Sequence, residues 1–104
     1  MQIQINTDKN VSVSNEQISA TNAFITKELS RFSEQITRVE VHLSDTDGSK
    51  DGPNDKGCLI EARLSGLKPM VASDNSNTFD QAVSGALEKL KASISSLKGR
   101  LEVQ

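Results

Sequence analysis

The last quarter of the chain, residues 78–101, carries the pattern that most constrains the fold. At about 100° per residue, apolar residues spaced by three or four fall on one stripe of a helix. The sequence therefore predicts a long final helix with one buried side, which the rest of the chain must cover. The residues of this stripe are Phe79, Val83, Leu87, Leu90, Ile94, Leu97 and Leu101.

Basic residues flank the stripe. On a helical wheel Lys91 and Lys98 lie on one side of it, and Lys89 and Arg100 lie on the other. Flanking cations of this kind ordinarily keep an amphipathic helix soluble. The alternative is that they contact an anionic partner, and the pattern alone leaves both interpretations open.

An earlier helix is predicted from a capping box, in which Ser14 is followed three residues later by Gln17. Lys27 and Arg31 lie four residues apart on its outer face. Ser76 or Asn77 is expected to cap the final helix. The apolar stripe of the earlier helix is Ile18, Ile25, Leu29 and Phe32, with Phe24 to one side.

Strands are predicted where polar and apolar residues alternate, because that period leaves one face dry. The segments are 2–6, 37–45 and 58–64, and a fourth strand is expected over 69–74. Pro69 lacks a ladder donor, so this last strand should begin there or lie at an edge. Residues 46–57 contain no apolar side chain and many turn formers, which predicts a long flexible loop.

The resulting order, β-α-β-β-β-α, predicts an α+β fold in one domain spanning residues 1–104. A four-stranded sheet carrying both helices on one face buries the dry side of every element. The other face should stay open, with side chains of mixed charge that can pair across strands. Those side chains are Gln2, Gln4, Arg38, Glu40, His42, Glu61 and Arg63.

The sequence gives little support for a catalytic site. His42 is the only histidine and falls on the wet face of a strand, and Cys58 falls on a dry face with no identifiable base. No phosphate-binding glycine loop, dinucleotide fingerprint or nucleophile elbow is present. We therefore expect no enzymatic activity, no cofactor and no small-molecule substrate.

The loop aspartates invite a calcium interpretation, which their spacing does not support. Counting from Asp45, an EF-hand would need glycine at position 6 and glutamate at position 12, where this chain has Lys50 and Lys56. A solvated acidic loop is the simpler interpretation, and no metal is expected. The aspartates concerned are Asp45, Asp47, Asp51 and Asp55.

Composition narrows the partner classes. The chain has three phenylalanines, no tryptophan or tyrosine, and a formal net charge of −2. Stacking of single-stranded bases on exposed aromatic side chains is therefore nearly excluded. A single cysteine, the absence of a signal-peptide pattern and the absence of a long apolar run predict a cytoplasmic protein with no membrane association.

Three stretches together resemble the family of ribosome hibernation promoting factors and ribosome-associated inhibitors. They are residues 1–5, residues 36–43, and the series from Val71-Ala72-Ser73 through Phe79 and Ala82-Val83 to Lys89-Leu90. The runs RVEVHLSD, GPNDKGCLIEAR and TFDQAVSGALEKLKASI are similar to a divergent branch of sigma-factor modulation proteins. The likeness covers almost the whole chain, which resembles the short form without a C-terminal ribosome-pairing extension.

The resemblance implies a shape similar to double-stranded RNA-binding domains and a non-enzymatic role. Family members occupy the small ribosomal subunit, hold ribosomal RNA phosphates with cations of both helices, and stop translation during stress or stationary phase. Arg31 and Lys89 match usual basic positions, whereas the next two on the second helix fall on Ala92 and Ser96. The candidate RNA-binding residues are thus Lys27, Arg31, Lys89, Lys91, Lys98 and Arg100.

Two functional hypotheses follow. In the first, the chain is a ribosome-associated factor whose partner is the small subunit and its RNA. In the second, it is a protein-interaction or regulatory domain that keeps the fold and has lost strong RNA binding, as the net charge and the residues Ala92 and Ser96 suggest. Weak self-association is compatible with either.

Overall fold

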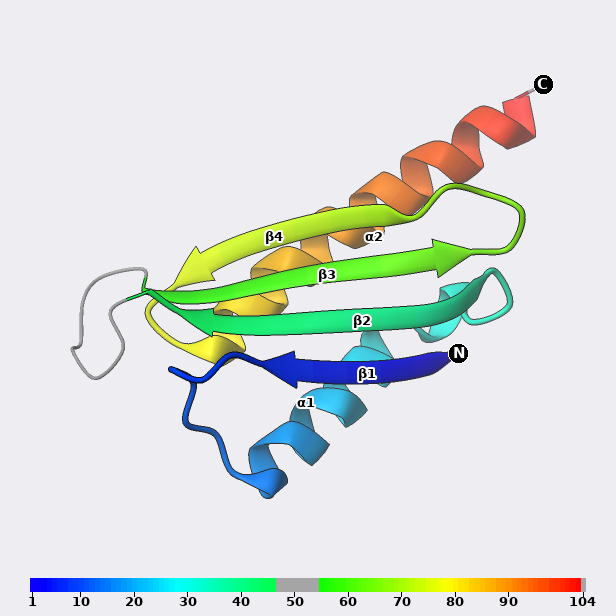
Figure 1. Ribbon diagram of the computed structural model, residues 1–104. Helices are drawn as coiled ribbons and strands as arrows, with labels where there is room; N and C mark the ends of the chain where they lie inside the picture. The colour runs from blue at the N-terminus through cyan, green and yellow to red at the C-terminus, as the bar shows by residue number, and fades with distance from the viewer. Residues whose placement is uncertain (47–54, 104) are drawn as a thin grey trace.

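The computed structural model describes residues 1–46 and 55–103, with residues 98–103 described through their backbone alone. Both helices cover the same face of a four-stranded sheet (Figure 1). The predicted order β-α-β-β-β-α is confirmed, with a short 3₁₀ helix added after the first helix. The elements are β1 (Gln2–Thr7), α1 (Asn15–Glu28), η1 (Ser30–Phe32), β2 (Ile36–Asp45), β3 (Lys56–Leu64), β4 (Met70–Ser76) and α2 (Phe79–Val103).

The strands lie side by side in chain order. β1 runs parallel to β2, and the β2–β3 and β3–β4 pairs are antiparallel. β4 is therefore an edge strand and begins directly after Pro69, as predicted. Because β1, β2 and β4 point the same way, α1 and α2 both start from the same end of the sheet (Figure 1).

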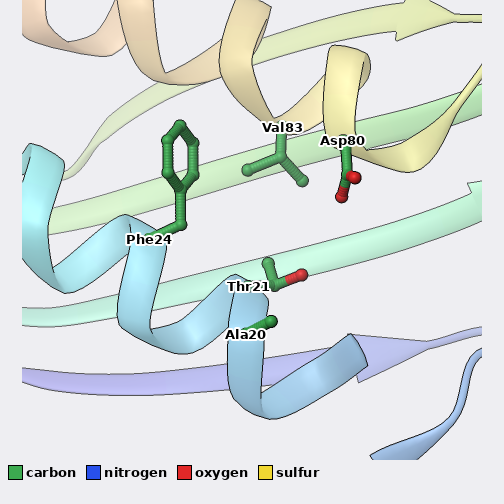
Figure 2. A pocket seen from close by; sticks show the side chains of 5 residues that line it. All are labelled: Ala20, Thr21, Phe24, Asp80 and Val83. Carbon is green, nitrogen blue, oxygen red and sulfur yellow. The ribbon is translucent and has the colours of Figure 1, made fainter. Parts of the chain in front are cut away.

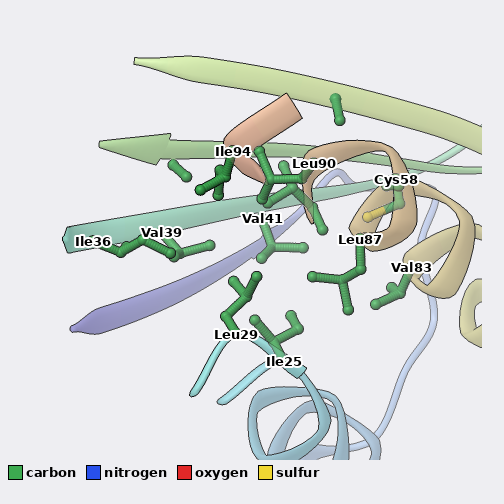
Figure 3. Packing of buried hydrophobic residues seen from close by; sticks show 14 of the residues in the cluster. Ile25, Leu29, Ile36, Val39, Val41, Cys58, Val83, Leu87, Leu90 and Ile94 are labelled. Atoms are coloured by element: carbon green, nitrogen blue, oxygen red, sulfur yellow. The ribbon is translucent and has the colours of Figure 1, made fainter. Parts of the chain in front are cut away.

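The core lies between the helices and the inner sheet face (Figure 3). α2 contributes the predicted stripe from Val83 to Ile94, of which Leu87 and Leu90 are almost completely buried, while Phe79 and Leu97 are partly buried and the Leu101 side chain lies outside the described residues. Ile25 of α1 and Leu29, the residue that follows α1, are also fully buried. Each such side chain stabilises the fold by about 1.5–3 kcal/mol relative to an exposed one.

Within the described residues, neither helix has the length and apolar character of a membrane span.

The helix starts are set by side-chain caps. The Ser14 hydroxyl accepts from the Gln17 amide N–H at 3.1 Å, and the Gln17 side chain accepts from the Ser14 N–H at 3.0 Å, which confirms the capping box. The predicted cap of α2 was wrong. Ser76 still belongs to β4, and the Thr78 hydroxyl accepts from the Gln81 N–H at 3.1 Å instead.

The start of β3 also differs from the expectation. Lys56 and Gly57, which the composition assigned to the loop, pair with Asp45 and Ser44 of β2. The ammonium of Lys56 contacts Asp45 at 3.0 Å and Asp55 at 2.8 Å, so the two buried carboxylates share one cation at the base of the connection. The hydrogen bonds that Lys56 donates to Asp55 and Asp45 raise the pKa of Lys56, which stays charged.

The open sheet face carries the predicted polar residues, but the ion pairs found there within residues 1–46 and 55–103 lie along single strands rather than across them. Arg38 lies opposite Arg63, and Glu40 lies opposite Glu61. Because like charges face each other, each arginine pairs along its own strand, Arg38 with Glu40 at 3.0 Å and Arg63 with Glu61 at 3.5 Å. Arg38 also donates to Gln2 and Gln4 on β1.

α2 crosses β4 at very close range near Gly85. A Cβ built on Gly85 would lie 1.9 Å from Oδ2 and 2.7 Å from Cγ of Asp74, which points from β4 toward the helix. Glycine in a helix interior normally costs about 0.5–1 kcal/mol relative to alanine. At position 85 the Asp74 side chain occupies the space of a Cβ, so glycine is the residue that fits without a shift.

We expect Gly85→Ala to destabilise the protein by about 1–3 kcal/mol, although the change would favour an unconstrained helix. Urea denaturation gives the free energy of unfolding that checks this. In an Asp74→Ala background the clashing carboxylate is absent, so the cost of Gly85→Ala should fall by more than half. An alanine that stabilises the wild-type background would contradict the close approach.

Candidate RNA interface

The six predicted cations all belong to the helix layer. Lys27 lies on α1, Arg31 on η1, and Lys89 and Lys91 on α2. Lys98 and Arg100 fall within the last turns of α2, where the side chains lie outside the described part of the chain. The described cations occupy three different electrostatic settings.

Lys27 and Arg31 have no carboxylate ion-pair partner among the described residues. Lys27 is exposed on α1 and forms no ion pair with the described residues. The Arg31 guanidinium lies over the Phe32 ring, 4.5 Å from its centroid, and Nη2 donates to the Ser95 hydroxyl of α2 at 3.3 Å. Arg31 is thus held in place by neutral groups alone.

Lys91 is paired across the two helices. Its ammonium donates to Glu28 Oε1 at 2.9 Å, which ties α2 to the end of α1. The hydrogen bond from Lys91, and next the charge of Lys91, lower the pKa of Glu28 below its ordinary value. The pair therefore presents little net charge.

Lys89 lies on the other side of α2 and is paired with the sheet edge. Its ammonium donates to the Ser73 carbonyl at 3.0 Å and to Asp74 Oδ1 at 3.2 Å. The predicted placement of Lys89 and Lys91 on opposite sides of the apolar stripe is thus consistent with their partners. Further along the helix, Ala92 and Ser96 are exposed and add no charge.

An apolar pocket of about 320 Å³ separates the first halves of α1 and α2 (Figure 2). Phe24 is 39% exposed at this site, and Asp80 supplies a carboxylate. The helix stripe placed Phe24 to one side, and the sequence did not predict a pocket there. The lining residues are Ala20, Thr21, Phe24, Asp80 and Val83.

The residues considered for catalysis lie elsewhere. His42 is exposed on the open sheet face, with Nε2 3.9 Å from Glu40. Cys58 is buried beneath α2, and burial, with a smaller contribution from Asp74, raises the pKa of its thiol to about 12. A buried thiol with a raised pKa is a poor nucleophile, because the thiolate is the reactive form.

The loop aspartates do not form a described metal site. Asp45 and Asp55 are buried around Lys56. The Lys56 ammonium pairs with both carboxylates, which is the role a bound metal ion would otherwise have. Asp47 and Asp51 lie outside the described residues. Within residues 1–46 and 55–103, no group of histidine, cysteine and acidic side chains is suited to hold a metal ion.

The chain matches one known protein family in sequence. Residues 4–102 match the family described as Sigma 54 modulation protein / S30EA ribosomal protein. No curated protein matches the chain in sequence.

Solved structures share the fold at low sequence identity. A ribosomal subunit interface protein from Coxiella burnetii is 20% identical with a TM-score of 0.75, and the match covers 95% of this chain and 99% of that one. The N-terminal domain of Protein Y from Thermus thermophilus is 17% identical with a TM-score of 0.67, and the match covers 93% and 99%.

The Glu28–Lys91 pair makes a titration prediction. Because the pKa of Glu28 is lowered in the folded state, its contribution to stability is present above about pH 4.5, the ordinary value for a glutamate, and is lost as the pH falls through the lowered pKa. In Lys91→Met the pKa of Glu28 should rise toward its ordinary value. Carboxyl-carbon NMR titration measures the shift, and Lys89→Met, which leaves this pair intact, is the control. An unchanged Glu28 titration in Lys91→Met would refute the pairing.

Proposed function

This chain belongs to the Sigma 54 modulation protein / S30EA ribosomal protein family, and on that premise we propose that it is a cytoplasmic factor that binds the small ribosomal subunit and represses translation. The observation that carries the proposal is the family match, which covers residues 4–102. The family is non-enzymatic, so repression would follow from occupancy alone.

The described surface supports recognition of folded RNA through its backbone. Phosphate contacts need cations at fixed positions and do not need exposed aromatic rings. Lys27 and Arg31 meet this requirement, because both are exposed on the helix layer with no acidic ion-pair partner among the described residues. Phe32, by contrast, is buried and unavailable for base stacking.

A second function, a protein-interaction or regulatory domain with weakened RNA binding, also has support. Lys89 and Lys91 are paired with carboxylates, and Ala92 and Ser96 are neutral. The apolar pocket beside Phe24 would suit a protein side chain better than a phosphate. Binding to ribosomal particles separates the two candidates.

We expect the protein to co-sediment with purified small ribosomal subunits at about 50 mM salt. Lys27→Glu with Arg31→Glu should weaken binding by about tenfold or more and reduce the salt slope by about two units, since two phosphate contacts are lost. Lys9→Glu with Lys68→Glu is the matched control, because it makes the same change in net charge at exposed positions outside the helices.

The outcomes are distinct. A wild-type protein that stays in the supernatant would overturn the proposal and favour the interaction domain. Equal loss in both double variants would show an effect of net charge without a defined surface. Thermal unfolding of each variant establishes that the fold is retained.

A further inference from the structure

We propose that Glu28 and Asp74 compete with RNA phosphates for Lys91 and Lys89, so that the helix layer is partly neutralised by the protein's own carboxylates. This inference rests on the function proposed above and concerns how strongly the same surface can bind. It follows from a contrast among the described cations. Two of them are bonded to carboxylates, and two, Lys27 and Arg31, are not.

The Glu28–Lys91 pair is accessible to a competing anion. The two side chains are 32% and 25% exposed, so the pair lies at the surface between α1 and η1 on one side and α2 on the other. A phosphate that shares the Lys91 ammonium would lie close to the Glu28 carboxylate and be repelled by it. Binding must therefore either displace Glu28 or accept that repulsion.

The Asp74–Lys89 pair is also accessible, because the Lys89 side chain is 59% exposed. Lys89 donates to both the Ser73 carbonyl and the Asp74 carboxylate, which directs the ammonium toward the edge strand β4. Asp74 itself lies in the space left open by the missing side chain of Gly85. Its carboxylate is thereby placed within 3.2 Å of the Lys89 ammonium.

Ion pairing changes the salt dependence of binding. The slope of log K against log salt grows by about 0.7–0.9 for each phosphate neutralised. A lysine already neutralised by a carboxylate contributes little to that slope. Releasing one such lysine should therefore strengthen binding about tenfold at 50 mM salt and about fourfold at 200 mM salt.

The test compares Glu28→Gln with the wild type on two probes, purified small ribosomal subunits and a short double-stranded RNA. Glu61→Gln is the matched control, because it removes the same charge and releases Arg63 from a pair on the opposite, open sheet face. Asp74→Asn tests the second pair and retains the shape of the side chain against Gly85. Thermal unfolding confirms that each variant is folded.

The expected result is tighter binding and a steeper salt slope for Glu28→Gln and Asp74→Asn, with Glu61→Gln close to wild type. Unchanged or weaker binding by Glu28→Gln overturns the inference, because Glu28 would then be neutral or would orient Lys91 for the RNA. Equal strengthening by Glu61→Gln also overturns it, as an effect of net charge.

Failure of the proposed function is recognisable separately. The wild type could fail to bind small subunits while Glu28→Gln binds the double-stranded RNA more tightly than Glu61→Gln does. That result would support the competition between Glu28 and phosphate and would overturn the proposed ribosomal function. If no variant binds either probe at 50 mM salt, both are overturned.

Discussion

Burial of the α2 stripe against the inner sheet face is the interaction on which the rest of the structure depends. Leu87, Leu90 and Ile94 are buried where α2 packs against β3 and β4, and this contact fixes the helix on the sheet. α1 contacts both β1 and α2, and polar contacts join the two helices near the end of α1, where Glu28 pairs with Lys91 and Arg31 of η1 donates to Ser95. The same arrangement leaves the pocket beside Phe24 and determines which carboxylates lie near which cations.

Local pattern predicted most of the fold, because periodicity, capping and proline placement are properties of neighbouring residues. The capping box at Ser14, the edge position of β4 and the buried α2 stripe are examples. The errors occurred where a tertiary or ladder contact decides a boundary. Lys56 belongs to β3 because it pairs with Asp45 of β2 in the ladder and through its ammonium. Ser76 belongs to β4 because it pairs with Lys56, and Thr78 therefore caps α2.

The candidate cations could be selected from the sequence, whereas the carboxylates that pair with them could not. Lys91 and Glu28 are 63 positions apart, and Lys89 and Asp74 belong to different elements. No spacing rule connects such residues, so the sequence showed the cations without their carboxylate partners. The family likeness likewise indicated where basic residues are expected. It did not indicate which of them pair with carboxylates in this chain.

The outer face of the sheet bears on how the chain reaches this structure. A slip of two residues between β2 and β3 would keep every side chain on its face and would place Arg38 opposite Glu61 in place of Arg63. The outer charges thus favour the wrong alignment, a local frustration that the core must override. The register irregularity between Ile36 and Arg38, and Gly57 fitting closely against Ser44, oppose that slip at both ends of the ladder. The correct register of β2 and β3 is consequently favoured by the buried inner face and by the two strand ends. The charges of the solvent-facing side favour the shifted register instead.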